Sequence, residues 1–305
     1  MTFSELIAVY LFLGGTAAGA YAVLASLDTC EAVRARYGNA GGGRRTEGRL
    51  CESSYRRMQR IVYGASLAMM AVGVLCLIAD LGRPDAFYYL MIYPTGSLVS
   101  IGALALSLLI GCLVAGFCDA AFTLGERAGS ALLAAKAAGV PVAFAVMTYT
   151  GMLLESAVAV KLWQTPWLPV LFMLSALSCG CVVVLLGMCL CEDRRAVTRW
   201  ESRLVRFDFL VVLLETAVAA LLFADLARVA DASTLHEVLA GEHASMFWLG
   251  FVSCSLLLPL SAEAFSMAGR RRLRPSSLAL VSACVLAGGL CLRIVMVAAG
   301  VQPVV

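Results

Sequence analysis

Long apolar stretches separated by short polar connections run the whole length of the chain. A helix crosses the hydrocarbon core of a bilayer, about 30 Å thick, with about 20 apolar residues. Eight stretches fit this requirement, at residues 6–27, 61–81, 96–118, 138–159, 167–191, 207–226, 244–268 and 277–301. The pattern therefore predicts an all-α integral membrane protein with eight transmembrane helices in the lipid bilayer.

The composition agrees with this fold class and argues against others. The 305 residues are 61% hydrophobic and 14% charged, whereas ordinary soluble domains are about 45–50% apolar and about 25% charged. The first stretch is too long and too rich in Gly and Ala for a cleaved signal peptide, so we expect it to remain as a span. No basic patch is interleaved with aromatic residues, so nucleic acid is not an expected partner.

The positive charges are distributed asymmetrically between the connections. Nineteen of the 23 Lys and Arg residues lie in the connections that follow the first, third, fifth and seventh stretches. Because cytoplasmic connections are enriched in Lys and Arg, both termini are predicted to lie outside the cytoplasm. The one long connection, 28–60, has a glycine-rich centre and is expected to be a flexible, solvated cytoplasmic loop.

A short internal repeat suggests how the spans are grouped. Residues 79–83 end the second stretch, residues 224–228 end the sixth, and the two segments agree at four of five positions. A genuine repeat would mean two four-helix bundles in the same orientation, residues 1–159 and residues 160–305. Chance similarity is the alternative.

Ionisable residues inside the apolar stretches are the first candidates for function. Glu215 lies near the middle of the sixth stretch and Arg293 about two-thirds of the way across the last. Glu155, Asp208 and Glu263 lie near the ends of theirs. Alternatives without function are solvation at the membrane interface for these last three, pairing for packing for Glu215, and snorkelling to the outer surface for Arg293. A buried carboxyl group suits a residue that takes up and releases protons, and a transporter could use it equally well.

The cysteines and histidines do not form a pattern typical of a metal or haem site. Ten of the 12 cysteines lie in apolar stretches, and no Cys-x-x-Cys pair occurs, so we expect buried thiols and no Fe–S cluster. The two histidines, His236 and His243, lie in one polar connection, so no pair of histidine ligands is available for a haem inside the bundle. Axial Met or Cys ligands are the alternative, but we expect no haem. We therefore expect this chain to bind no metal ion.

A charged motif, Asp80-Leu81-Gly82-Arg83-Pro84, ends the second stretch. Glycine and proline stop a helix, so one interpretation is a helix end with its charges at the interface. The other interpretation is a functional site, because charges at the end of a buried helix are costly and are often used.

Several short motifs occur in an order that resembles the NrfD/polysulfide-reductase membrane-subunit family along nearly the whole chain. They are YLFLGG at 10–15, AG at 18–19, DLGRP at 80–84, YTGMLL at 149–154, WQTPWLP at 163–169, FMLSAL at 172–177, Glu215, Pro259, GGLCLR at 288–293 and AG at 299–300. Two departures are visible: Tyr10 stands where some relatives carry histidine, and residues 93–97 (YPTGS) stand where the family commonly has Ser-Pro-Met-Ser.

The resemblance implies a haem-free subunit of a prokaryotic inner membrane that exchanges electrons with menaquinone or a related quinone. It implies a ferredoxin-like Fe–S partner, often a molybdopterin catalytic subunit as well, and no catalytic activity of the chain alone. Carried over residue by residue, it assigns quinone binding to Tyr10, Asp80, Arg83 and Tyr149. We assign the proton route to Glu155, Glu215 and Arg293.

The direction of electron flow and two other function classes stay open at this point. Quinol oxidation is our hypothesis, because the polar residues gather at the outer side, but quinone reduction uses the same residues. A secondary transporter would also contain buried carboxyl groups and a parallel repeat. A passive membrane anchor for an outer enzyme would need no quinone site, and its Asp80 and Glu215 would tolerate substitution.

Overall fold

A computed structural model describes residues 5–37, 45–80, 97–122, 126–156, 163–190, 194–229, 239, 241, 243–268 and 275–301. The regular secondary structure among these residues is all helical. The elements are α1 (Glu5–Tyr37), α2 (Arg45–Asp80), α4 (Leu98–Ala121), α5 (Glu126–Glu155), α6 (Trp167–Cys189), α7 (Arg194–Val229), η3 (Met246–Leu257), α9 (Leu258–Ala268) and α10 (Pro275–Val301).

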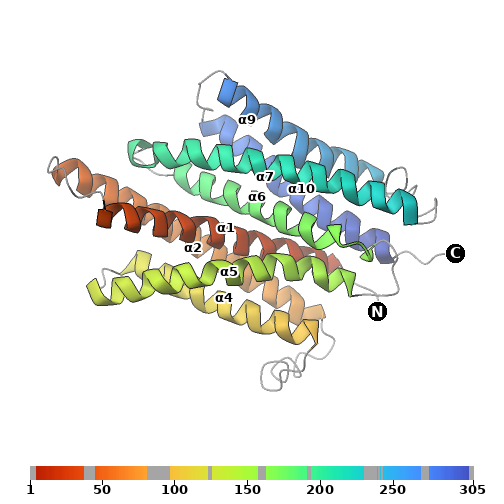
Figure 1. Ribbon diagram of the computed structural model, residues 1–305, viewed down its shortest axis with the longest axis horizontal. Helices are drawn as coiled ribbons and strands as arrows, with labels where there is room; N and C mark the ends of the chain where they lie inside the picture. Colours follow the sequence, from red (N-terminus) through yellow and green to blue (C-terminus); the bar gives the residue numbers. More distant parts are fainter. Residues whose placement is uncertain are drawn as a thin grey trace.

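The expected eight spans are confirmed. Eight helical segments within the described residues are long and apolar enough to cross a membrane, with η3 and α9 together forming one of them. The start of α1 and the end of α10 lie at the same end of the helix bundle (Figure 1). We call this end the terminal end, and the opposite end, where α2 and α7 begin among arginines, the basic end.

The helices α1 and α6 form the centre of the bundle. Most of the spanning part of each is buried, 78% in both cases, whereas the other spans are 28–50% buried. Both contact α5 and α10 as well as each other; α1 also packs on α2, and α6 on α7. Figure 1 shows α1, α2, α4 and α5 on one side, with α6, α7, α9 and α10 on the other. The division of a single membrane domain, residues 1–305, into two four-helix halves at residue 159 stays a prediction.

Small residues allow the two central helices to cross closely. A Cβ atom on Gly19 of α1 would lie 2.1 Å from the carbonyl oxygen of Ala176, and one on Gly180 of α6 would lie 2.2 Å from the carbonyl carbon of Gly19. Any larger residue at either position would push the backbones apart. The packing role expected of small residues in membrane helices therefore applies to this crossing.

Two helices extend well beyond the bilayer, contrary to the expectation of a long solvated loop at 28–60. The helices α2 and α7 have 36 residues each, which corresponds to about 54 Å at about 1.5 Å per residue. A hydrocarbon core of about 30 Å leaves several turns outside it. Residues 28–37 and 45–60 are helical rather than looped, and the glycine-rich centre of the expected loop lies outside the described residues.

The seventh span departs from a regular α-helix. Residues Met246–Leu257 form a π-helix before α9 begins at Leu258. The backbone N–H of Leu258 donates to the carbonyl oxygen of Ser253, five residues earlier. Pro259 follows directly and has no N–H to continue the pattern. Residues 244–268 were expected to form one α-helix, and apolar length alone did not reveal this change of hydrogen-bond register.

Candidate functional site

Two buried tyrosines lie near the terminal end of the bundle. Tyr10 of α1 is fully buried, and its hydroxyl group has no hydrogen-bond partner among the described residues. Tyr149 of α5 is 7% exposed, and its hydroxyl is close enough to that of Tyr10 for the two to interact electrostatically. The structure thus brings together two of the residues that the resemblance placed in a quinone pocket.

Glycines on neighbouring helices make room for the two tyrosine rings. A Cβ atom on Gly102 of α4 would lie 1.9 Å from Cζ of Tyr149, so only glycine fits beneath that ring. A Cβ atom on Gly73 of α2 would lie 3.7 Å from Cδ2 of Tyr10, which is ordinary contact. Four helices, α1, α2, α4 and α5, therefore shape this tyrosine site.

Asp80 and Glu155 lie at the same end as the tyrosines. Asp80 is the last residue of α2 and is half-buried, with an interaction partner in the structure. Glu155 ends α5 and is also half-buried, so interfacial solvation remains open for it. Arg83 and the rest of the motif at 81–84 lie outside the described residues.

Arg293 is completely buried in α10, so the snorkelling alternative is wrong. Its Nη1 atom donates to Ser175 Oγ at 2.6 Å and to the Gly289 carbonyl oxygen at 2.9 Å, and its Nη2 atom donates to the Phe172 carbonyl oxygen at 3.2 Å. The guanidinium carbon also lies 5.1 Å from the centre of the Phe172 ring. Neutral acceptors hold this cation in place, and no carboxylate among the described residues bonds to it directly.

Glu215 of α7 is the nearest candidate counter-charge in the core. It is fully buried, and neither carboxyl oxygen has a hydrogen-bond partner within the described part of the chain. Glu215 and Arg293 nevertheless interact electrostatically. Because they form no direct ion pair, packing alone does not explain a glutamate here, and an unpaired buried charge is costly.

A pair of buried carboxyl groups lies toward the basic end. Asp208 of α7 is fully buried and Glu263 of α9 is 4% exposed, so interfacial solvation is wrong for both. The two carboxyl groups interact with each other, and Ser178 and Cys181 of α6 lie beside Asp208. Both oxygens of Asp208 and one of Glu263 have no partner with hydrogen-bond geometry among the residues described.

These buried acids lie in a column along α7. Asp208 and Glu215 are seven residues apart, which places them on one face of the helix, about 10 Å apart along its axis. The column leads from Asp208 and Glu263 near the basic end to Glu215 and Arg293 near the centre. The sequence contained the seven-residue spacing as a usable signal, but the contact with Glu263 on another helix was not readable from it.

Asp28 of α1 is a fourth buried carboxylate, and both of its oxygens accept hydrogen bonds. Tyr55 and Gln59 donate to Oδ1 at 2.8 and 2.7 Å, while Tyr63 and Lys136 donate to Oδ2, both at 2.9 Å. The three donors from α2 recur every four residues, so they share one face of that helix. Sequence reasoning missed this site because Asp28 and Lys136 were read as residues of solvated connections.

Lys136 joins three helices at this position. Its ammonium group also donates to Asp119 Oδ2 of α4 at 2.6 Å, and its side chain is 2% exposed. Tyr21 of α1 donates to the Lys136 carbonyl oxygen at 3.0 Å. One cation therefore neutralises two carboxylates and ties α1, α4 and α5 together. We call Asp28, Lys136, Asp119 and their donors the lysine cluster.

The comparisons with known proteins agree with this architecture. The family model described as "Polysulphide reductase, NrfD" matches residues 1–305. The protein is 30% identical to the C subunit of polysulfide reductase from Wolinella succinogenes, with 83% of this sequence and 80% of that subunit covered. It is 29% identical to protein NrfD of Escherichia coli strain K12, with 83% and 81% covered. The chain therefore belongs to the NrfD family of polysulphide reductase membrane proteins, and it is a multi-pass protein of a prokaryotic membrane.

Proposed function

We propose that this chain is the haem-free, quinone-reactive membrane subunit of a respiratory oxidoreductase complex. It passes electrons between menaquinol and an Fe–S partner subunit, in the direction of quinol oxidation. The observation that supports this most is the burial of Tyr10 and Tyr149 at the end of the bundle where the half-buried Asp80 also lies, in a chain of the NrfD family. A ferredoxin-like subunit and a molybdopterin catalytic subunit are the proposed partners, which fits the name of the relative, a subunit of polysulfide reductase.

The tyrosine site supplies what a quinol headgroup needs. Each quinol hydroxyl group donates one hydrogen bond, and its oxygen can accept another. The Tyr10 hydroxyl is buried and has no hydrogen-bond partner among the described residues. It can therefore donate a hydrogen bond to one quinol hydroxyl group or accept one from it. Tyr149 can serve the second, and Asp80 can accept a proton released on oxidation. Arg83 is proposed to help bind the headgroup from the same motif.

The column of buried acids is the proposed proton route. Glu215, which has no hydrogen-bond partner in the described part of the chain, can gain or lose a proton without breaking a hydrogen bond. Neutral acceptors hold Arg293 in place. Its charge can therefore stabilise a deprotonated Glu215 without a direct ion pair between the two side chains. Asp208 and Glu263 extend the route toward the basic end, and Glu155 lies at the terminal end.

Substitutions at the tyrosine site test the proposal in the assembled complex. Tyr149→Phe and Asp80→Asn are expected to lower the rate of menaquinol oxidation at least tenfold, since removing a positioned acid–base group typically costs about 10²–10⁴ in rate. Tyr21→Phe is the matched control, because Tyr21 is buried at the other end and donates only to a backbone carbonyl. Wild-type rates for both site variants would refute the pocket assignment.

Purification distinguishes this function from a secondary transporter, which the buried carboxyl groups also allow. We expect the chain to be isolated together with an Fe–S subunit and bound menaquinone. A transporter would be isolated alone, and a passive anchor would bring the partner but no quinone. Either of those results would contradict the proposal.

A further inference from the structure

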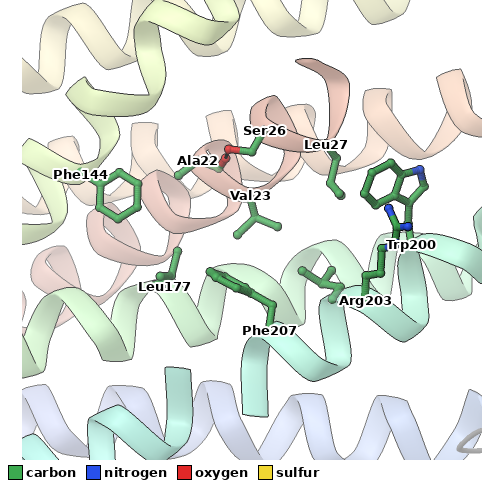
Figure 2. Close-up of a pocket in the computed structure, with 10 residues that line it drawn as sticks. Ala22, Val23, Ser26, Leu27, Phe144, Leu177, Trp200, Arg203 and Phe207 are labelled. Atoms are coloured by element: carbon green, nitrogen blue, oxygen red, sulfur yellow. Dashed lines mark hydrogen bonds between the residues drawn. The ribbon is translucent and has the colours of Figure 1, made fainter. Parts of the chain in front are cut away.

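An apolar groove opens between the two sets of helices toward the basic end. It has a volume of about 290 Å³ and is lined by residues of α1, α5, α6 and α7 (Figure 2). Its walls include Val23 and Leu27 of α1, Phe144 of α5, Leu177 of α6 and Phe207 of α7. Phe144 and Phe207 are 37% and 43% exposed, so the groove is open along the face that meets lipid rather than closed inside the bundle.

The mouth of the groove is positively charged. The guanidinium carbons of Arg34 and Arg203 lie 4.8 and 5.2 Å from the centre of the Trp200 ring. The indole N–H of Trp200 donates to the carboxylate of Glu31, which fixes the ring. Both arginines are exposed, and neither forms an ion pair with any residue that the structure describes. Two guanidinium groups are thus held on one aromatic ring with donors still available.

The length of the groove corresponds to one leaflet. Arg203 and Trp200 lie in the first turn of their span, Trp200–Arg228, whereas Phe144 lies near the middle of its span, Gly129–Glu155. The groove therefore runs from the headgroup level at the basic end to about the midplane of the bilayer. The positive-inside rule assigns the basic end to the cytoplasmic side, where anionic lipids attract clustered arginines.

We propose that this groove binds an anionic phospholipid of the cytoplasmic leaflet. One acyl tail fills the groove between α1, α5, α6 and α7, and the phosphate group is bound by Arg34 and Arg203 above Trp200. Guanidinium groups bind phosphate oxygens through charge-assisted hydrogen bonds. Tryptophan side chains settle at the headgroup level of a bilayer, which is where the mouth of the groove lies. The lipid thereby bridges the helices on the two sides of the α1–α6 crossing.

Native mass spectrometry of the complex purified in mild detergent tests the headgroup contacts. The double variant Arg34→Gln/Arg203→Gln is expected to retain about 30-fold less phosphatidylglycerol or cardiolipin than the wild type, since each arginine strengthens binding to an anionic surface about fivefold. Arg206→Gln is the matched control, because Arg206 is exposed on the same turn of α7 but does not line the groove. Equal retention in all three proteins would overturn the proposal, as would menaquinone or a zwitterionic lipid as the retained molecule.

A second experiment leaves both arginines and the fold unchanged. Delipidated wild-type complex is mixed with phosphatidylglycerol whose acyl tails carry bromine, and tryptophan fluorescence is compared with that of a Trp200→Phe complex. We expect brominated phosphatidylglycerol to quench the Trp200 component several-fold more than brominated phosphatidylcholine does. Ser26→Phe, which fills the groove from α1 (Figure 2) without adding a fluorescent indole, should abolish the difference. Equal quenching by the two lipids in the wild type would overturn the proposal.

Discussion

Both sides of the helix bundle have buried carboxyl groups toward the basic end, but these groups differ in their hydrogen bonding. In the lysine cluster, Asp28 accepts four hydrogen bonds, one of them from Lys136. On the other side, Asp208 is equally buried and accepts none with good geometry from the described residues, and its nearest ionisable neighbour is another acid, Glu263. An ion pair with all its hydrogen bonds made does not readily gain or lose a proton. Unpaired buried acids cost folding free energy, and such residues are commonly retained for function.

This difference indicates a structural role for the lysine cluster and a role in proton transfer for the acids of α7 and α9. The lysine cluster ties α1, α2, α4 and α5 together and has no group free to exchange a proton without breaking several bonds. The acids on α7 and α9 make few such bonds, so a proton can move among them with little rearrangement. We therefore expect substitutions in the lysine cluster to lower stability, and substitutions in the acid column to leave stability nearly unchanged while affecting turnover.

The largest effect is expected from Lys136→Met. This change removes the cation and leaves two carboxylates, Asp28 and Asp119, without their partner. Breaking a buried ion pair by removing one member costs about 3–5 kcal/mol. Denaturant titration in mild detergent should show a loss of free energy of unfolding of this size. A loss below about 1 kcal/mol would mean that the cluster does not hold the helices together.

A smaller loss is expected from Tyr63→Phe, which removes one of the four donors to Asp28 and nothing else. Leaving a buried acceptor partly unsatisfied costs about 1–3 kcal/mol. The midpoint of thermal unfolding should fall accordingly. Tyr149→Phe is the control with the same chemical change, since no hydrogen bond from the Tyr149 hydroxyl is present in the described structure, and its midpoint should stay near that of the wild type. Equal shifts of the unfolding midpoint in the two variants would mean that the hydrogen bond from Tyr63 to Asp28 adds no stability.

The smallest change in stability is expected from Glu263→Gln. The substitution keeps the shape of the side chain and removes a carboxyl group that faces Asp208, so stability should change by less than about 1 kcal/mol. Proton uptake coupled to menaquinol oxidation, measured with a pH-sensitive dye in proteoliposomes, should nevertheless fall. If coupled proton movement is unchanged, the column is not a proton route.

The sequence was sufficient for the architecture and for part of the site. The length and apolar composition of a span are properties of one continuous stretch of sequence. All eight spans could therefore be predicted. Glu215 and Arg293 stood out because a charge in an apolar stretch is visible without a structure. The resemblance assigned Tyr10 and Tyr149 to one quinone pocket. The structure buries both near the terminal end, and Gly102 leaves room for the Tyr149 ring.

The features that were missed depend on contacts between distant helices. Lys136 and Asp28 are 108 residues apart, and nothing in either local sequence indicates the other. Asp208 and Glu263 each appear near the end of a span, where solvation is the ordinary outcome. The packing of α7 on both α6 and α9 buries them in the structure. The Arg34–Trp200–Arg203 arrangement likewise joins the end of α1 to the start of α7.

One matched pair of variants tests the central claim most directly. Asp28→Asn and Asp208→Asn make the same chemical change at two buried positions near the same end of the bundle. The free energy of unfolding, measured by denaturant titration in one detergent, is predicted to fall by about 3 kcal/mol for Asp28→Asn. For Asp208→Asn it is predicted to stay within about 1 kcal/mol of the wild type or to rise. Equal losses for the two variants, or a larger loss for Asp208→Asn, would contradict the account.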